Sequence, residues 1–152
     1  KYKFLAIISG PEPQRSLLEE EIQNCFLKTN QHCAIINGLR NKKDTLFENI
    51  SFYPHLETTA FKKLLTKSEL VICRSGYSSI MDLYILQKKV LFIPTPGQTE
   101  QEYLAKHHQK IHSIYYQKQG RINLEKARFN FIYTKAETKK KLLKLAFNKS
   151  GL

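Results

Sequence analysis

Two clusters of polar residues, each directly after an apolar run, carry the residue types that could do chemistry in this chain. The first is the turn at residues 74–79, RSGYSS, which follows the apolar run 70–73. Gly76 lets an anion approach the backbone, and the N–H groups that begin the next helix point towards that anion. Ser75, Ser78 and Ser79 can add hydroxyl donors. We therefore expect an anion site here, with an ordinary capped strand-to-helix turn as the alternative.

An acidic residue stands about one turn into the helix that follows. The carboxylate of Asp82 can accept hydrogen bonds from two vicinal hydroxyls, as acidic residues do for ribose. The alternative is that Asp82 only stabilises the helix dipole, which contributes about 0.3–1 kcal/mol. The turn is neither a Walker motif, since no Gly-Lys-Ser/Thr follows it, nor a dinucleotide fingerprint, since the second and third glycines are missing.

The second polar cluster is the loop 94–101, PTPGQTEQ, which follows the apolar run 90–93. Its amides, hydroxyl and carboxylate are the groups that form a hydrogen-bond fork for a neutral sugar. A site of this kind is selective because the wrong ligand leaves its buried polar groups unpaired. The alternative is an exposed polar loop that caps the next helix.

Alternating strands and helices must position these clusters. The pattern predicts strands over 2–9, 33–36, 50–53, 70–73, 90–93 and 113–116, and helices over 14–29, 58–66, 78–87, 102–110 and 131–148. The segments 39–48 and 120–128 are predicted to be connections. Several strands are apolar on both faces, so we expect an α/β fold, a Rossmann-like three-layer parallel sheet with helices on both faces. Ligands bind such sheets at the carboxyl ends of the strands, where both clusters lie.

Two helices carry further expectations. In the helix over 14–29, the apolar positions expected to face the sheet are Leu17, Leu18, Ile22, Cys25 and Phe26. Thr58 or Thr59 is expected to cap the helix over 58–66. The two histidines of the helix over 102–110, His107 and His108, are expected at the surface.

Composition limits the classes of function. The 152 residues suffice for one domain, and 25 basic against 13 acidic residues give a net charge of +12, which favours phosphate-bearing partners. No basic motif interleaved with aromatic residues supports RNA binding, so we expect no nucleic-acid partner. Lys139, Lys140 and Lys141 are expected on the solvated face of a terminal helix, with a peripheral contact to an anionic membrane as the alternative.

The cellular compartment is suggested by the cysteines and by the absence of targeting signals. Cys25, Cys33 and Cys73 have no metal-ligand spacing and an apolar context, which predicts free thiols in a reducing compartment, the cytoplasm. No metal site is expected. The chain shows no secretory signal and no apolar run near the ~20 residues needed to span a bilayer. It begins on a strand without an initiator methionine, so we expect a fragment of a longer protein.

Both clusters also carry a family resemblance. The segments CRSGYSSIMDL (73–83) and VLFIPTPGQTEQEYLA (90–105) resemble the C-terminal, donor-binding domain of two-domain GT-B nucleotide-sugar glycosyltransferases. The pattern is most similar to the enzymes that transfer N-acetylglucosamine from UDP to a lipid-linked acceptor in peptidoglycan synthesis. The resemblance implies that residues 1–152 form one donor-binding domain, half of a GT-B fold, whose N-terminal acceptor domain is not part of this chain.

The resemblance also assigns roles to residues by position. It places the donor diphosphate at Ser75, Gly76, Tyr77, Ser78 and Ser79. Asp82 takes the family's acidic position for the ribose hydroxyls, where glutamate is usual. The backbone of Leu56 would meet the uracil.

For the sugar, Gln101 and Glu102 match the family's paired amides, and the glutamate in place of the second glutamine indicates a different sugar. Gln98, Thr99 and Glu100 precede them in the same cluster. In the first loop, Gly10 and Arg15 are expected to contact phosphate or acceptor.

The implied activity is transfer of a hexose or N-acetylhexosamine from a UDP-sugar, with inversion, to an acceptor glycan or lipid-linked sugar. Helix N–H groups would stabilise the leaving diphosphate, so no metal cofactor is expected. The resemblance places the catalytic base in the missing domain, so this chain alone would bind donor without transferring sugar. Two alternatives stay open: a non-catalytic nucleotide-sugar-binding domain, and an epimerase-like relative that would need Glu100 and Glu102 as its acid/base pair.

Overall fold

The computed structural model describes residues 1–39, 43–76, 80, 83, 86–112, 114–128 and 130–131. Short apolar runs form strands and amphipathic segments form the helices between them, in the order β1 (Tyr2–Ile7), α1 (Gln14–Leu27), β2 (Cys33–Ile36), β3 (Thr45–Phe47), β4 (Ile50–Tyr53), α2 (Thr58–Lys67), β5 (Ser68–Cys73), β6 (Lys89–Phe92), α4 (Thr99–His112) and β7 (Asn130–Phe131).

These strands form one sheet in the order β3-β4-β2-β1-β5-β6-β7. The five central strands are parallel, and β3 and β7 pair antiparallel at the two edges. The chain moves outward from β1 through β2 and β4, then returns to the other side of β1 to form β5 and β6. The strand order therefore reverses between β1 and β5, the switch point where open α/β sheets bind ligands.

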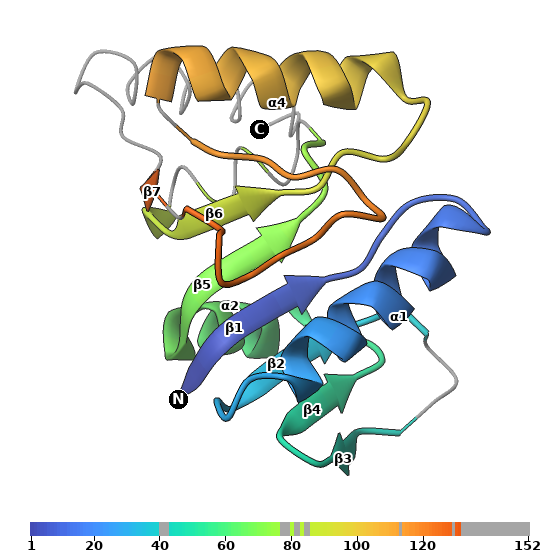
Figure 1. Cartoon of the computed structure of the whole chain (residues 1–152). Coiled ribbons are helices and arrows are strands. Elements are labelled where there is room, and N and C mark those ends of the chain that lie inside the picture. The colour runs from blue at the N-terminus through green and yellow to red at the C-terminus, as the bar shows by residue number, and fades with distance from the viewer. Residues whose placement is uncertain are drawn as a thin grey trace, which may run out of the picture.

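Two hydrophobic cores cover the two faces of the sheet. On one face α1 packs through Leu18, Ile22 and Phe26, which recur every four residues and are all buried. On the other face α2 contributes Leu64 and Leu65, and the residues packing there also include Ile80, Leu83 and, from α4, the half-buried Leu104. Figure 1 shows α1 and α2 on opposite sides of the strands. The predicted three-layer α/β fold is confirmed.

Several predicted element boundaries are wrong. Of the strand predicted over 113–116, the described residues show only an isolated bridge between Phe92 and Tyr116. The segment 39–48, predicted as a loop, contains β3, which pairs with β4. Helix α4 begins at Thr99 and not at residue 102, so the last three residues of the polar loop, 99–101, belong to its first turn. Phe131, predicted to begin a helix, lies in β7, and the rest of the predicted helix lies outside the described residues.

Several side chains also depart from the expectations. Leu17 is 49% exposed, because α1 turns only a narrow stripe to the sheet. Glu57 occupies the N-cap of α2, and no side chain caps it, so neither Thr58 nor Thr59 has the predicted role. His108 is buried, with its ring 6.1 Å from that of Phe92, and is therefore not a surface residue.

The described part of the chain contains no helix long and apolar enough to cross a membrane. Cys25, Cys33 and Cys73 are free thiols, as predicted.

Candidate functional site

The carboxyl edge of the parallel strands is built from the segments that leave β1, β5 and β6. In Figure 1 the arrowheads of these strands and the first turns of α1 and α4 lie toward the same side of the molecule. The loop 8–13 follows β1, Arg74 follows β5 and Pro94 follows shortly after β6. Both polar clusters predicted from the sequence therefore meet at one edge, next to the switch point.

Arg74 lies at the centre of this edge, and its side chain is buried, with 2% exposure. Its guanidinium donates to four backbone carbonyls: Nε to Ser9 at 3.3 Å, Nη1 to Ile93 at 3.1 Å and Pro94 at 3.3 Å, and Nη2 to Gln14 at 3.1 Å. These carbonyls belong to the loop after β1, the start of α1 and the end of β6. One side chain thus holds three neighbouring segments together across the switch point.

A second network fixes the loop after β6. The Gln101 side chain accepts from the Thr95 backbone N–H at 2.8 Å and donates to Gln98 Oε1 at 2.8 Å. The buried Ser75 hydroxyl donates to the Gln101 backbone carbonyl at 2.7 Å. The two polar clusters are therefore hydrogen-bonded to each other. The Thr95 hydroxyl is buried here and has no hydrogen-bond partner among the described residues.

The Gly76 carbonyl accepts from the N–H of Ile80 at 3.1 Å, and Ile80 is helical, so Gly76 lies one turn before a helical residue. A Cβ added at Gly76 would meet no atom within 4 Å, and its φ lies outside the left-handed region. The other described glycines, Gly10, Gly38, Gly97 and Gly120, all have positive φ, a backbone conformation that L side chains rarely adopt. Gly76 is thus the one described glycine that the fold itself does not require.

Four of the predicted donor residues, Tyr77, Ser78, Ser79 and Asp82, lie outside the described residues. Their predicted roles stay predictions.

The first loop carries a neutralised cation. Arg15 donates to the Glu12 carboxylate from Nε and Nη2, both at 2.9 Å, and from Nη1 to the Asn37 carbonyl at 2.6 Å. Hydrogen bonds from Ser16 and the charge of Arg15 hold the pKa of Glu12 below its ordinary value. Gly10 is exposed in the same loop, with a φ of 108°. The predicted phosphate contact at Arg15 would have to compete with Glu12.

The remaining predicted residues line the same edge. Leu56 follows β4 and is half-buried against the core. Thr99 and Glu100 are exposed in the first turn of α4, while Glu102 is half-buried. Glu102 borders a hollow of about 210 Å³, whose lining is Pro94, Pro96, Glu102, Lys106, Tyr116, Lys118 and Gln119.

The described side chains at this edge do not form a nucleophilic or metal centre. Burial raises the pKa of the Cys73 thiol to about 12, so this thiol stays protonated at neutral pH and is not a nucleophile. Among the described residues, no group of three His, Cys, Asp or Glu side chains could hold a metal ion. What the edge offers is backbone amides, side-chain amides and one buried cation.

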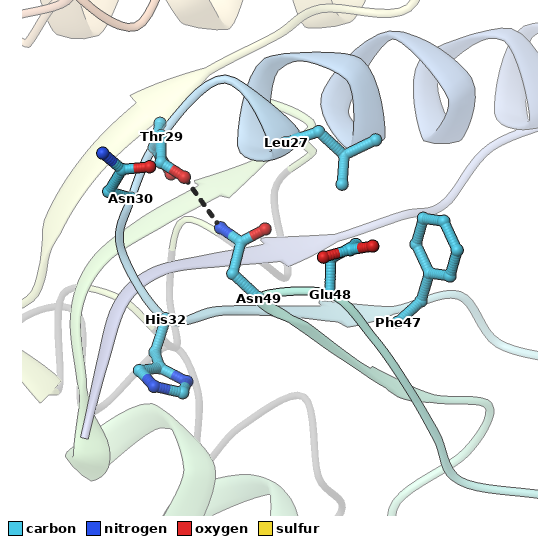
Figure 2. Close-up of a pocket in the computed structure, with 7 residues that line it drawn as sticks. All are labelled: Leu27, Thr29, Asn30, His32, Phe47, Glu48 and Asn49. Carbon is cyan, nitrogen blue, oxygen red and sulfur yellow. Dashed lines mark hydrogen bonds between the residues drawn. The ribbon is translucent and has the colours of Figure 1, made fainter.

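A wider hollow, about 700 Å³ in volume, lies at the opposite, amino edge of the sheet. Figure 2 shows its lining residues, Leu27, Thr29, Asn30, His32, Phe47, Glu48 and Asn49. The Asn49 side-chain amide donates to the carbonyls of Phe26, Thr29 and Gln31, so it stabilises the loop before β2. The lining mixes isolated polar groups with exposed apolar side chains and has no set of groups that converge on a ligand.

Comparison with known proteins agrees with this geometry. Residues 7–144 match the model of the glycosyltransferase family 28 C-terminal domain. The crystal structure of MurG from Acinetobacter baumannii is similar, with a TM-score of 0.59 and 19% identity. The likeness covers 82% of this chain and 40% of the MurG chain. No curated protein matches the sequence.

Proposed function

Since this chain belongs to the family of glycosyltransferase family 28 C-terminal domains, we propose that it binds the UDP-sugar donor of a glycosyltransferase. The observation that carries the proposal is Gly76. It lies beside the switch point, its carbonyl bonds the helical Ile80, and neither its φ nor its packing requires a glycine. A bound group that must approach the backbone closely gives this glycine a reason, and a helix N-terminus favours an anionic group.

The donor lies along the carboxyl edge in this proposal. The diphosphate sits at Gly76 with the rest of the turn 75–79, and Asp82 holds the ribose. The uracil meets the backbone of Leu56, which follows the neighbouring strand β4. The sugar lies over the first turn of α4, where its contacts are Gln98, Thr99, Glu100, Gln101 and Glu102. The hydrogen bonds that join Ser75, Gln101 and Gln98 support a common site for diphosphate and sugar.

The proposed chemistry is transfer of a hexose or N-acetylhexosamine with inversion. The acceptor hydroxyl loses its proton to a base and forms a bond to the anomeric carbon. The bond from that carbon to the diphosphate oxygen breaks on the opposite face, and UDP leaves. Backbone N–H groups at the helix start stabilise the charge that develops on the leaving diphosphate, so the proposed reaction needs no metal.

The base and the acceptor site belong, in this proposal, to an N-terminal domain outside this chain. The acceptor is then a glycan or a lipid-linked sugar, and the chain alone binds donor but does not transfer sugar. The three free thiols support a cytoplasmic location, and the net charge of +12 supports a peripheral contact with an anionic membrane.

Calorimetric titration of the 152-residue chain with UDP, ADP and GDP tests the proposal. We expect UDP to bind most tightly, and Gly76→Ala to weaken UDP binding at least about tenfold without lowering the thermal midpoint. Gly120→Ala is the control, because its φ of 87° makes it costly for the fold and not for the ligand. Equal binding of all three nucleotides, or none, rules the proposal out.

A related experiment addresses the ribose. Asp82→Ala should lower UDP affinity and leave inorganic diphosphate binding unchanged, because only the hydroxyl contacts are removed. If diphosphate binding falls equally, Asp82 has some other role.

An epimerase-like function is less well supported. Glu100 and Glu102 are two residues apart on α4, and positions i and i+2 of a helix do not face each other. Incubating the chain with UDP-N-acetylglucosamine and following the sugar by NMR tests this: epimerisation without an acceptor would favour the alternative.

A further inference from the structure

The positive charge of Arg74 is not needed to hold the neighbouring segments together. A buried guanidinium is expensive to remove from water, and the usual compensation is a carboxylate. None of the ion pairs among the described residues involves Arg74; its bonds go to four backbone carbonyls, which are neutral acceptors. The neighbouring Arg15, by contrast, is paired with Glu12 at 2.9 Å. Among the described residues, therefore, Arg15 is neutralised by a carboxylate and Arg74 is not.

That charge persists under ordinary conditions. Burial lowers the pKa of Arg74 to about 10, an effect that the more distant Glu21 partly opposes. A guanidinium with this pKa is still protonated at neutral pH. It lies beside the switch point, bonded to Ser9 after β1 and two residues before Gly76. Its surroundings are buried, so solvent screens the charge less than at a surface.

We propose that Arg74 is a positioning residue for the donor diphosphate: its guanidinium holds the segments after β1 and β6 in place and supplies the buried positive charge that the diphosphate neutralises. This inference rests on the proposed function, because it needs a diphosphate at Gly76. Arg74 touches neither phosphate nor sugar in this account. It acts in two ways. It fixes the loops that surround the ligand, and its positive charge attracts the anion at Gly76 in addition to the backbone N–H groups there.

The test compares two variants that are similarly short and polar and differ in charge, Arg74→Lys and Arg74→Gln. For each, the affinities for UDP and for uridine are measured on the 152-residue chain by calorimetry. We expect Arg74→Gln to lower the UDP-to-uridine affinity ratio about tenfold, and Arg74→Lys to restore it to within about threefold of the unchanged chain. If Arg74 had a purely structural role, the affinities for UDP and for uridine would fall by the same factor, and they would do so in both variants.

The outcomes separate this inference from the proposed function. If the unchanged chain does not bind UDP, the proposed function fails. If it binds UDP and both variants lower the ratio equally, or neither does, Arg74 is only a clamp and the inference is overturned.

A second measurement uses only the unchanged chain, so it does not depend on whether a variant folds. The Arg74 side-chain Nε–H resonance, assigned by selective labelling, is followed by NMR while UDP or uridine is added to the unchanged chain. We expect a shift on saturation with UDP that uridine does not reproduce. An unmoved resonance with bound UDP contradicts the proposal.

Discussion

At each edge of the sheet a side chain donates to three or more backbone carbonyls, and these two donors differ in charge. At the amino edge the Asn49 amide donates to the carbonyls of Phe26, Thr29 and Gln31 at 2.6–3.1 Å. At the carboxyl edge the Arg74 guanidinium donates to four carbonyls at 3.1–3.3 Å. Asn49 is half-buried, whereas Arg74 is buried.

The amino edge shows that a neutral amide is enough to close a loop between a helix and a strand. An amide has no charge to desolvate, so holding segments together does not by itself explain a guanidinium at the other edge. The difference supports the proposal that the carboxyl edge binds an anion, whereas the Asn49 amide has a structural role in the loop before β2.

The largest expected effect compares the two clamps directly. Arg74→Met should lower the free energy of unfolding by about 3 kcal/mol or more, because four carbonyls lose a charged donor. Asn49→Ala should cost about 1–2 kcal/mol, since its carbonyls are nearer to water. Urea denaturation of both variants measures the difference. Equal losses would remove the energetic distinction between the edges.

Ser75→Ala sharpens the comparison within the carboxyl edge. The Ser75 hydroxyl donates to the Gln101 carbonyl at 2.7 Å, so its loss should destabilise the chain by about 1 kcal/mol. UDP affinity should change less than about threefold, because the hydroxyl is already bonded to Gln101 and Ser75 can offer the diphosphate only its backbone N–H, which the substitution keeps. Thermal denaturation and calorimetry measure the two effects. A loss of affinity without a loss of stability would show that the hydroxyl serves the ligand.

A smaller effect is expected from Glu12→Gln, which removes the partner of Arg15 without removing a donor from the edge. The freed charge should raise UDP affinity about twofold to threefold.

The pH dependence of the chain's stability follows in part from the lowered pKa of Glu12. Its contribution to stability is present above the unfolded pKa and is lost as pH falls through the lower, folded pKa. NMR titration of the carboxylate checks the direction, and an unchanged UDP affinity would mean that Arg15 lies too far from the ligand.

The smallest effect concerns Thr95, whose buried hydroxyl finds no hydrogen-bond partner in the described part of the chain. Thr95→Val keeps the shape and removes an unsatisfied polar group, so stability should be unchanged or rise by up to about 1 kcal/mol. A clear loss of stability would reveal a partner for the hydroxyl, such as a buried water. Differential scanning calorimetry distinguishes these outcomes.

Local pattern was enough to predict the parallel core. The apolar runs that became β1, β2, β4, β5 and β6 are each bounded by turn residues, so their type and order followed from the sequence. The edge strand β3 could not be found in this way. Its three residues are all exposed, and its strand conformation depends on pairing with β4.

The site was predictable in location but not in its internal bonding. Gly76 and the polar loop marked the carboxyl edge, since turn residues after strands collect there. Arg74 stands in the turn predicted as an anion site, but its bonding could not be predicted, because only the tertiary fold brings Ser9, Gln14 and Ile93 around it. His108 was misassigned for a similar reason: its burial against Phe92 depends on where α4 docks.

The antiparallel strands at the margins of the sheet have a consequence for how copies of the chain meet. A long, flat outer strand invites another molecule to extend the sheet, which is a route to fibrils. Here the outermost described strands span three residues, Thr45–Phe47, and two residues, Asn130–Phe131. So short a ladder gives an incoming strand few main-chain groups to pair with. The molecule can therefore keep a nearly all-apolar parallel centre without offering it as a template for polymerisation.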